Sequence, residues 1–213
     1  MPKPIFISFE GPEGAGKTSV LEALISELKT KLGDNLVTTR EPGGNPISEA
    51  IRSILQPEED NGMDKRTEAL LYTAARRQHL VENIKPALDQ NKIVISDRYV
   101  DSSLAYQGGG RGLGIDNIWE INQFAIDGLL PDMTIYLDVP VEIGLARVNE
   151  NRQGKIDRLD KDSISFHQKV RETYLKLQSE FSDRIKIVDA TQPLNKVIDD
   201  TRILINQILE DKS

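Results

Sequence analysis

Short apolar runs alternate along the chain with longer segments in which apolar residues recur at helical spacing. The apolar runs predict five β-strands, at residues 5–9, 35–40, 92–96, 133–138 and 185–188. The helical spacing predicts helices at residues 20–32, 47–55, 64–90, 115–128 and 163–181, and two more that begin at Pro140 and Pro193. Because strands and helices alternate, we expect a three-layer α/β fold: a five-stranded parallel sheet with helices on both faces.

Several segments depart from this regular pattern. Residues 41–46 contain two prolines and two glycines, which exclude regular structure there. Residues 108–112 are glycine-rich and predict a flexible loop, while residues 149–161 are densely charged and predict a mobile surface loop. Pro86 lacks an N–H group, so we expect it to kink or interrupt the helix at 64–90.

In a parallel sheet, ligands bind at the carboxyl ends of the strands. Four stretches fall at such ends: residues 9–18, Arg40-Glu41, Asp97-Arg98 and Asp138. The last of these carries the least information about a ligand. Asp138 stands just before the helix that begins at Pro140, so we interpret it as a helix cap.

Composition and charge narrow the range of partners. The chain has 213 residues, 38% hydrophobic and 29% charged, which predicts a globular domain. Its net charge of −7 argues against a nucleic-acid polymer, which needs a basic surface. The lack of cysteine excludes disulfides and thiolate metal sites. No apolar run has the length of a membrane span or a signal segment, so we expect a cytoplasmic protein with no membrane partner.

The stretch after the first strand carries the strongest chemical signal. It reads G-x-x-x-x-G-K-T, between a predicted strand and a predicted helix, and consists of Gly11, Pro12, Glu13, Gly14, Ala15, Gly16, Lys17 and Thr18. Glycines let backbone N–H groups close around phosphate oxygens, and the helix N-terminus attracts anions. Lys17 can reach the β- and γ-phosphates of ATP, and the Thr18 hydroxyl can hold Mg²⁺.

Phosphate loops occur in kinases, GTPases and motor ATPases, so further features are needed. The sequence has no Asn-Lys-x-Asp guanine-binding motif and no obvious second domain, which favours phosphoryl transfer to a small substrate. Tyr72 and Arg76 are four residues apart on a helix and share a face, which suits either a pyrimidine base or an ordinary core edge. At a strand end, Asp97 can hold Mg²⁺ and Arg98 can bind an acceptor phosphate, although the two could also form a buried ion pair.

The chain also resembles the bacterial thymidylate kinases over essentially its whole length. The matching stretches, in the order and spacing of that family, are FEGPEGAGKT at 9–18, TREPGG at 39–44, RTEALLYTAARR at 66–77, DRYVDSSLAYQGGGRG at 97–112 and PDMTIYLDV at 131–139. The resemblance implies a P-loop NTPase fold in one domain, residues 1–213, with a mobile lid at about 149–161. It also implies that the γ-phosphoryl group of ATP moves to thymidine monophosphate (dTMP) with Mg²⁺, as a step of dTTP synthesis, in a homodimer.

The resemblance further implies a role for individual residues. Tyr72 stacks on the base and Arg76 reads it, together with Ser103 and Gln107, which are four residues apart. Tyr106 packs against the sugar. The acceptor phosphate is bound by Arg98 and Arg52, with Arg40 a weaker third candidate. The resemblance also places Arg147 beside the adenine with residues 190–192. Glu13 is a carboxylate inside the phosphate loop, so we expect it to take part in catalysis by contacting the sugar 3′-hydroxyl or a metal-bound water, and Glu41 is a similar acidic candidate near the acceptor.

One further cation is expected outside the phosphate loop. Residues 12–15, the variable positions of the loop, include no basic residue, whereas phosphoryl transfer spreads negative charge over the transferred group. Arg147, Arg152 and Arg158 lie on or beside the charged segment 149–161. The resemblance implies a subtype in which a lid arginine supplies this charge, with Arg152 slightly favoured over Arg158.

Two other functions remain open from the sequence. A deoxynucleoside kinase would take thymidine instead of its monophosphate, but Arg52, Arg76 and Arg98 suit an acceptor that already carries a phosphate. A nucleotide-binding switch protein would bind without turnover. His79 and His167 have no companions at metal-ligand spacing, so we interpret both as ordinary helix residues.

Overall fold

The computed structural model describes residues 3–56, 62–151 and 162–212, built around a parallel sheet. Its five strands are β1 Ile5–Glu10, β2 Leu36–Arg40, β3 Ile93–Asp97, β4 Met133–Asp138 and β5 Ile185–Asp189. They lie in the order β2-β3-β1-β4-β5, and every neighbouring pair is parallel. The predicted five-stranded parallel sheet is therefore confirmed, with β1 at its centre.

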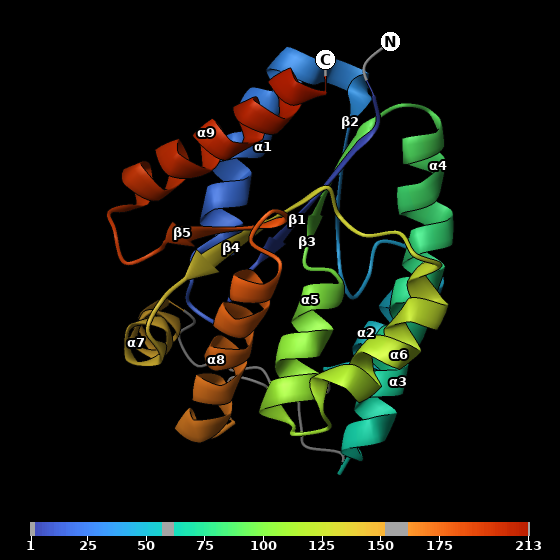
Figure 1. Cartoon of the computed structure of the whole chain (residues 1–213), viewed down its shortest axis with the longest axis vertical. Helices are drawn as coiled ribbons and strands as arrows, with labels where there is room; N and C mark the ends of the chain where they lie inside the picture. The colour runs from blue at the N-terminus through green and yellow to red at the C-terminus, as the bar shows by residue number, and fades with distance from the viewer. Residues whose placement is uncertain (1–2, 57–61, 152–161, 213) are drawn as a thin grey trace.

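Helices surround the sheet (Figure 1). The α-helices of the described ranges are α1 Lys17–Leu32, α2 Pro46–Leu55, α3 Lys65–His79, α4 Lys85–Asp89, α5 Val100–Ser103, α6 Ile115–Ile126, α7 Val141–Asn151, α8 Ile164–Glu180 and α9 Leu194–Asp211. A 3₁₀ turn, η1 Gly33–Asn35, and two π-helical segments, η2 Leu80–Ile84 and η3 Leu104–Gly110, join some of them. The π-helical segment η2 lies just before Pro86 and interrupts the helix where the proline removes a hydrogen-bond donor, as predicted.

The two faces of the sheet are covered by different helices. Alternate residues of β1, such as Ile5, Ile7 and Phe9, join one core cluster with apolar residues of α1 and α9, which lie side by side in Figure 1. On the other face, Phe6 packs against Tyr99 and the end of the long helix. This alternation is the period of two that a strand buried on both faces shows.

The second face also carries a buried polar row that the apolar pattern of residues 5–9 does not indicate. The hydroxyl groups of Ser8 and Thr134 lie 2.9 Å apart, and Thr134 donates to Asp101 Oδ2 over 2.9 Å. Glu10 continues the row at the end of β1 and is fully buried. Thr134 and Glu10 bond to Asp101 and Ser102 of α5, so the row packs against the segment that begins with Arg98.

The prediction of a flexible loop at residues 108–112 was wrong for residues 108–110, whereas Arg111 and Gly112 lie outside the helical segments. Gly108 to Gly110 belong to η3, which packs against α8. A Cβ atom on Gly109 would lie 2.0 Å from Thr173 Oγ1, and one on Gly110 would lie 2.6 Å from Phe166 Cε2. The glycines therefore allow close packing of two helical segments instead of providing a flexible turn.

Two other expectations about the region after β4 are corrected. Residues 149–151 form the last turn of α7 and are not loop; the rest of the segment 149–161 lies outside the described residues. Asp138 was interpreted as a helix cap, but it accepts two hydrogen bonds of 2.8 Å from Nε and Nη2 of Arg171. It thereby ties β4 to α8.

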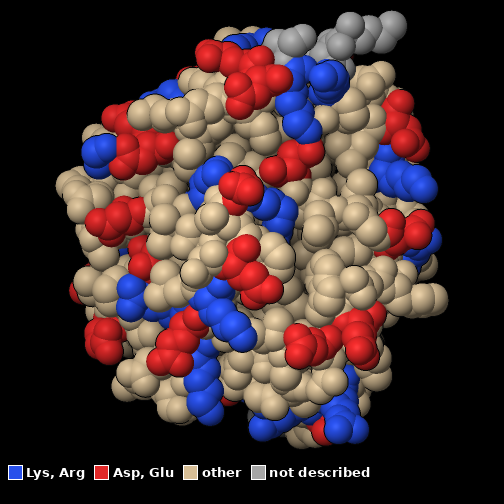
Figure 2. All heavy atoms as spheres, viewed as in Figure 1, with Lys and Arg blue, Asp and Glu red and all other residues tan. Residues whose placement is uncertain are grey.

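The surface carries charges of both signs. Figure 2 shows acidic and basic side chains interspersed over the face that it presents. None of the helices in the described part of the chain is long and apolar enough to cross a bilayer.

Candidate active site

The phosphate loop connects β1 to α1 and folds over its own lysine. Gly14 has a φ of 70°, and a Cβ atom there would lie 2.0 Å from the carbonyl oxygen of Gly144, so only glycine fits against α7. Lys17 Nζ donates to the carbonyl oxygens of Gly11 and Pro12, over 2.8 and 3.2 Å. The loop thus holds the ammonium group against two of its own carbonyl oxygens, at the N-terminus of α1.

The charge of Lys17 depends on its surroundings. Burial lowers the pKa of the ammonium group to about 8, and the positive charge of Arg98 acts in the same direction. The carboxylates of Asp97 and Glu13 raise the pKa and limit the fall. A positively charged group held partly out of water is a strong attractor for phosphate oxygens.

Glu13, at a variable position of the loop, is surrounded by donors. Tyr106 donates its hydroxyl hydrogen to Oε1 over 2.7 Å, and Arg98 Nη2 lies 3.5 Å from the same oxygen. His167 Nδ1 lies 3.4 Å from Oε2, at ion-pair distance. Burial raises the pKa of Glu13, but the approach of His167 and the charges of Arg98 and Lys17 outweigh it and lower the pKa to about 2. Glu13 is therefore a carboxylate at neutral pH.

Arg98 begins the segment that follows β3. Its backbone has a φ of 71°, a value that residues other than glycine rarely adopt. Its guanidinium group donates to Ser102 Oγ over 3.1 Å and to the Tyr106 hydroxyl over 3.3 Å. Asp97, at the end of β3, has a buried Oδ1 with no hydrogen-bond partner among the described residues. An unpaired buried carboxylate oxygen beside a phosphate loop suits a cation or a water held by one.

A pocket of about 630 Å³ joins these groups. Apart from Gly11 and Pro12, which are buried residues of the loop itself, it is lined by every predicted site residue of the described ranges: Glu13, Gly14, Ala15, Gly16, Lys17, Thr18, Glu41, Arg52, Tyr72, Arg76, Asp97, Arg98, Ser103, Tyr106, Gln107 and Arg147. Arg152 and Arg158 lie outside the described residues. Three of the four strand-end stretches expected from topology therefore line one pocket, and Asp138 does not.

Arg76, on α3, is 2% exposed and is held by several acceptors. Its Nε donates to Glu41 Oε2 over 2.8 Å, and its Nη1 donates to Ser103 Oγ and Asn122 Oδ1, over 2.8 and 2.5 Å. Its Nη2 donates to the carbonyl oxygen of Tyr99 over 3.0 Å. A guanidinium group has five N–H bonds, so these contacts leave one for a ligand.

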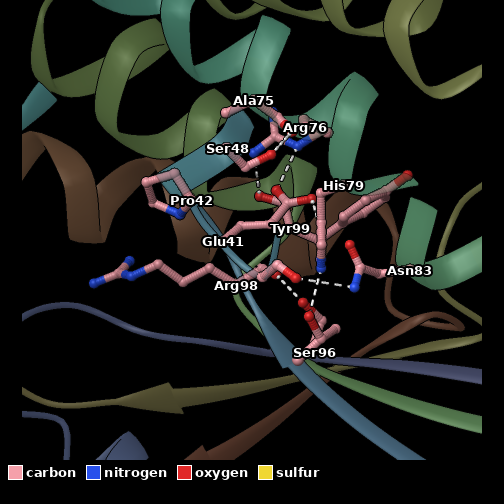
Figure 3. A network of polar contacts seen from close by, with 12 residues as sticks. Glu41, Pro42, Ser48, Ala75, Arg76, His79, Asn83, Ser96, Arg98 and Tyr99 are labelled. Carbon is pink, nitrogen blue, oxygen red and sulfur yellow. Dashed lines mark hydrogen bonds and ion pairs between the residues drawn. The ribbon is translucent and has the colours of Figure 1, made fainter. Parts of the chain in front are cut away.

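The network around Glu41 adds to the interpretation of two residues (Figure 3). Glu41, expected near the acceptor, lines the pocket, and each of its carboxylate oxygens also has a protein partner, Arg76 Nε for one and His79 Nδ1 at 2.9 Å for the other. His79 and His167 lie in α3 and α8, so both are helix residues, as interpreted. The structure adds that His79 is fully buried with its Nε2 2.5 Å from Thr39 Oγ1, and that His167 lies against Glu13. Glu41 and His79 therefore hold Arg76 in place.

The remaining predicted acceptor residues lie around the same end of the pocket. Arg52 Nη1 donates to the carbonyl oxygen of Pro42 over 2.9 Å. Arg40, the weaker candidate, pairs with Glu49 at 2.9 Å. Gln107 lines the pocket, but its amide group donates to the buried Glu68 over 2.9 Å. The spacing of residues gave no signal for Glu68, because it meets Gln107 only through packing of α3 against η3.

Arg147, which was expected beside the adenine, lines the same pocket. Its Nη1 donates to the carbonyl oxygen of Ala190 over 2.9 Å and lies 3.4 Å from that of Gly14. Gln192 also lines the pocket. The predicted proximity of Arg147 to residues 190–192 is present, and the arginine joins that loop to the phosphate loop.

Comparisons with known proteins agree with the resemblance seen in the sequence. The family model described as thymidylate kinase matches residues 9–201. A thymidylate kinase of Leuconostoc mesenteroides subsp. mesenteroides is 99% identical over 213 residues, 100% of both chains. That of Leuconostoc citreum is 77% identical and covers 100% of this chain and 99% of its own length.

A solved structure extends the agreement to the fold. The crystal structure of thymidylate kinase from Ehrlichia chaffeensis is 32% identical in sequence and matches with a TM-score of 0.78, covering 96% of this chain and 99% of that one. Sequence and fold therefore agree over nearly the whole chain. The chain belongs to the thymidylate kinase family.

Proposed function

We propose that the protein transfers the γ-phosphoryl group of ATP to dTMP and forms thymidine diphosphate, a step of dTTP synthesis. The observation that carries the proposal is one continuous pocket with a phosphate loop at one end and arginines at the other. Lys17 serves the donor, while Arg98 and Arg52 serve an acceptor that already carries a phosphate. In-line transfer between two phosphates requires such a pair of facing anion sites.

At the donor end, the phosphate loop binds and orients the polyphosphate. Backbone N–H groups of residues 13–18 cradle its oxygens, and Lys17 turns from the carbonyl oxygens of its own loop to the phosphates. Thr18 and Asp97 would hold Mg²⁺, which fits the unpaired Oδ1 of Asp97. When bound, the metal ion would offset negative charge on the phosphates. Arg147 positions the adenine side of the nucleotide.

At the acceptor end, the residues divide between phosphate, sugar and base. Arg98 and Arg52 bind the phosphate, and Tyr106 packs against the sugar. Glu13, a carboxylate held by Tyr106, accepts a hydrogen bond from a sugar hydroxyl or a metal-bound water. For the base, Tyr72 provides a stacking surface, and Arg76, Ser103 and Gln107 provide hydrogen bonds. Glu41 acts on the base only through Arg76.

The assignment of Tyr72 gives a specific prediction. Tyr72→Ala is expected to raise KM for dTMP by roughly 10-fold or more, because stacking of a base on an aromatic ring contributes about 1–3 kcal/mol. KM for ATP should change little. Steady-state kinetics with each substrate varied in turn measure both values. Tyr72→Phe, which keeps the ring, is the matched control, and an equal rise for both substrates would place Tyr72 outside the acceptor site.

One assay separates the proposed activity from the two alternatives. The protein is incubated with ATP, Mg²⁺ and either dTMP or thymidine, and ADP and the phosphorylated product are measured. A thymidylate kinase forms thymidine diphosphate from dTMP and leaves thymidine unchanged. A deoxynucleoside kinase forms dTMP from thymidine, and a nucleotide-binding switch forms neither product.

We further propose that the protein is one domain that acts as a homodimer, as the resemblance implies, and that it works in the cytoplasm. The support for the dimer is an exposed apolar face on helices that pack against one another, α2 on α3 and α3 on α6. Its exposed residues are Ile47, Ala50 and Ile54 on α2, Leu70 and Ala74 on α3, and Phe124, which is 90% exposed, on α6. Faces of this kind mark protein interfaces.

Sedimentation analysis tests the dimer. The unchanged protein is expected to sediment as a dimer, and Phe124→Asp as a monomer, because a carboxylate at the centre of an apolar interface loses its hydration. Ile203→Asp is the matched control, since Ile203 is 54% exposed on α9, away from that face. A monomeric unchanged protein would contradict the proposal.

A further inference from the structure

Arg98 depends on a backbone conformation that must be imposed by its neighbours. Its φ of 71° lies in the left-handed region, which residues with a Cβ atom rarely adopt. Arg98 N donates to the carbonyl oxygen of Phe9 over 2.9 Å, and Arg98 O accepts from Ser96 Oγ over 2.7 Å, the contact drawn in Figure 3. The first bond holds the peptide group before Arg98, and the second holds the carbonyl side of the peptide group after it, which leaves the Tyr99 N–H of that group to another partner.

Glu10, the last residue of β1, holds that next peptide group. Its Oε1 accepts the backbone N–H of Tyr99 over 2.7 Å. The side chain is fully buried and adjoins the phosphate loop in sequence, yet it does not line the pocket. Neither the donor nor the acceptor roles proposed above use it.

The second oxygen of Glu10 reaches the guanidinium group of Arg98 through one hydroxyl. Ser102 Oγ donates to Glu10 Oε2 over 2.5 Å and accepts from Arg98 Nη1 over 3.1 Å. The Tyr174 hydroxyl donates to the same carboxylate oxygen over 2.9 Å and so completes its surroundings. The Glu10 carboxylate therefore contacts both the backbone next to Arg98, through the Tyr99 N–H, and the guanidinium group, through the Ser102 hydroxyl.

We propose that Glu10 is a positioning residue that aims Arg98 at the phosphate of the acceptor. The inference rests on the proposed function, in which Arg98 binds that phosphate. Because Glu10 belongs to the strand that leads into the phosphate loop, it fixes the acceptor arginine relative to the donor loop. Glu10 itself touches no substrate.

The test compares the binding of dTMP and thymidine by titration calorimetry. Glu10→Ala is expected to weaken dTMP binding by about 10-fold to 100-fold, because it leaves the buried donors of Tyr99 and Ser102 without their acceptor, and to change thymidine binding by less than about 2-fold. Glu10→Gln keeps an oxygen for the Tyr99 N–H, so its loss should be smaller. In an Arg98→Ala background, Glu10→Ala should have no further effect on dTMP, because the residue that it positions is absent.

A second variant covers the case in which Glu10→Ala does not fold. Ser102→Ala removes only the hydroxyl between Glu10 and the guanidinium group, and should weaken dTMP binding several-fold without affecting thymidine. Equal losses for dTMP and thymidine, or a full loss that persists in the Arg98→Ala background, would overturn the positioning role. A folded wild-type protein that binds no dTMP would instead overturn the proposed function, and this role with it.

Discussion

Replacing Lys17 by alanine is expected to lower kcat by roughly 10³-fold, while the protein remains folded. The ammonium group lies in the phosphate loop at the N-terminus of α1, and no other basic residue occupies that loop. As the γ-phosphoryl group moves, negative charge spreads over its oxygens, and Lys17 offsets this charge inside a pocket partly removed from water. Because the interaction strengthens in the transition state, the loss should fall mainly on kcat.

The measurement is the rate of ADP formation under saturating ATP and dTMP, with circular dichroism and thermal unfolding as checks of folding. Lys29→Ala is the matched control, because Lys29 is exposed near the far end of the same helix. It should retain kcat. A folded Lys17→Ala protein with the wild-type kcat would contradict the assignment of the loop.

We expect one arginine of the segment after α7 to stabilise the negative charge of the transition state. Replacing it by alanine should lower kcat by roughly 10³-fold or more, a loss comparable to that of Lys17→Ala. Arg152 and Arg158 are the candidates; both lie outside the described residues, so this proposal rests on the sequence. The structure bears on their alternative, Arg147, which bonds to the carbonyl oxygens of Ala190 and Gly14 at the adenine end. We therefore continue to favour Arg152 slightly over Arg158.

Three single alanine variants, at 147, 152 and 158, separate these candidates. The catalytic arginine should lower kcat and leave KM for dTMP nearly unchanged, since it contacts only the group in transfer. Arg202→Ala is the control, because that arginine pairs with Glu27 and Asp199 on the surface of α9 and α1. Near-normal kcat in all three variants would return the role to Lys17, Arg98 and the metal ion.

The sequence alone determined the parts of this protein that depend on local spacing. The alternation of apolar runs and helical periodicity predicted the five strands of a parallel sheet, because both periods follow from backbone geometry. Topology then brought the phosphate loop, Arg40-Glu41 and Asp97-Arg98 to one pocket, since the carboxyl ends of parallel strands share an edge. The match of motif order and spacing identified the family, which the comparisons confirmed.

Only the tertiary structure decided how the site residues are held. His79 pairs with Glu41 across 38 residues, and Glu10 accepts from Tyr99 across 89, distances at which no sequence period operates. The glycines at 108–110 are a second example. Their lack of side chains is compatible with a flexible loop and with close helix packing, and only the position of α8 shows that they serve packing. Buried polar groups must find partners wherever the packed chain brings them, and that choice is made by the whole fold instead of its segments.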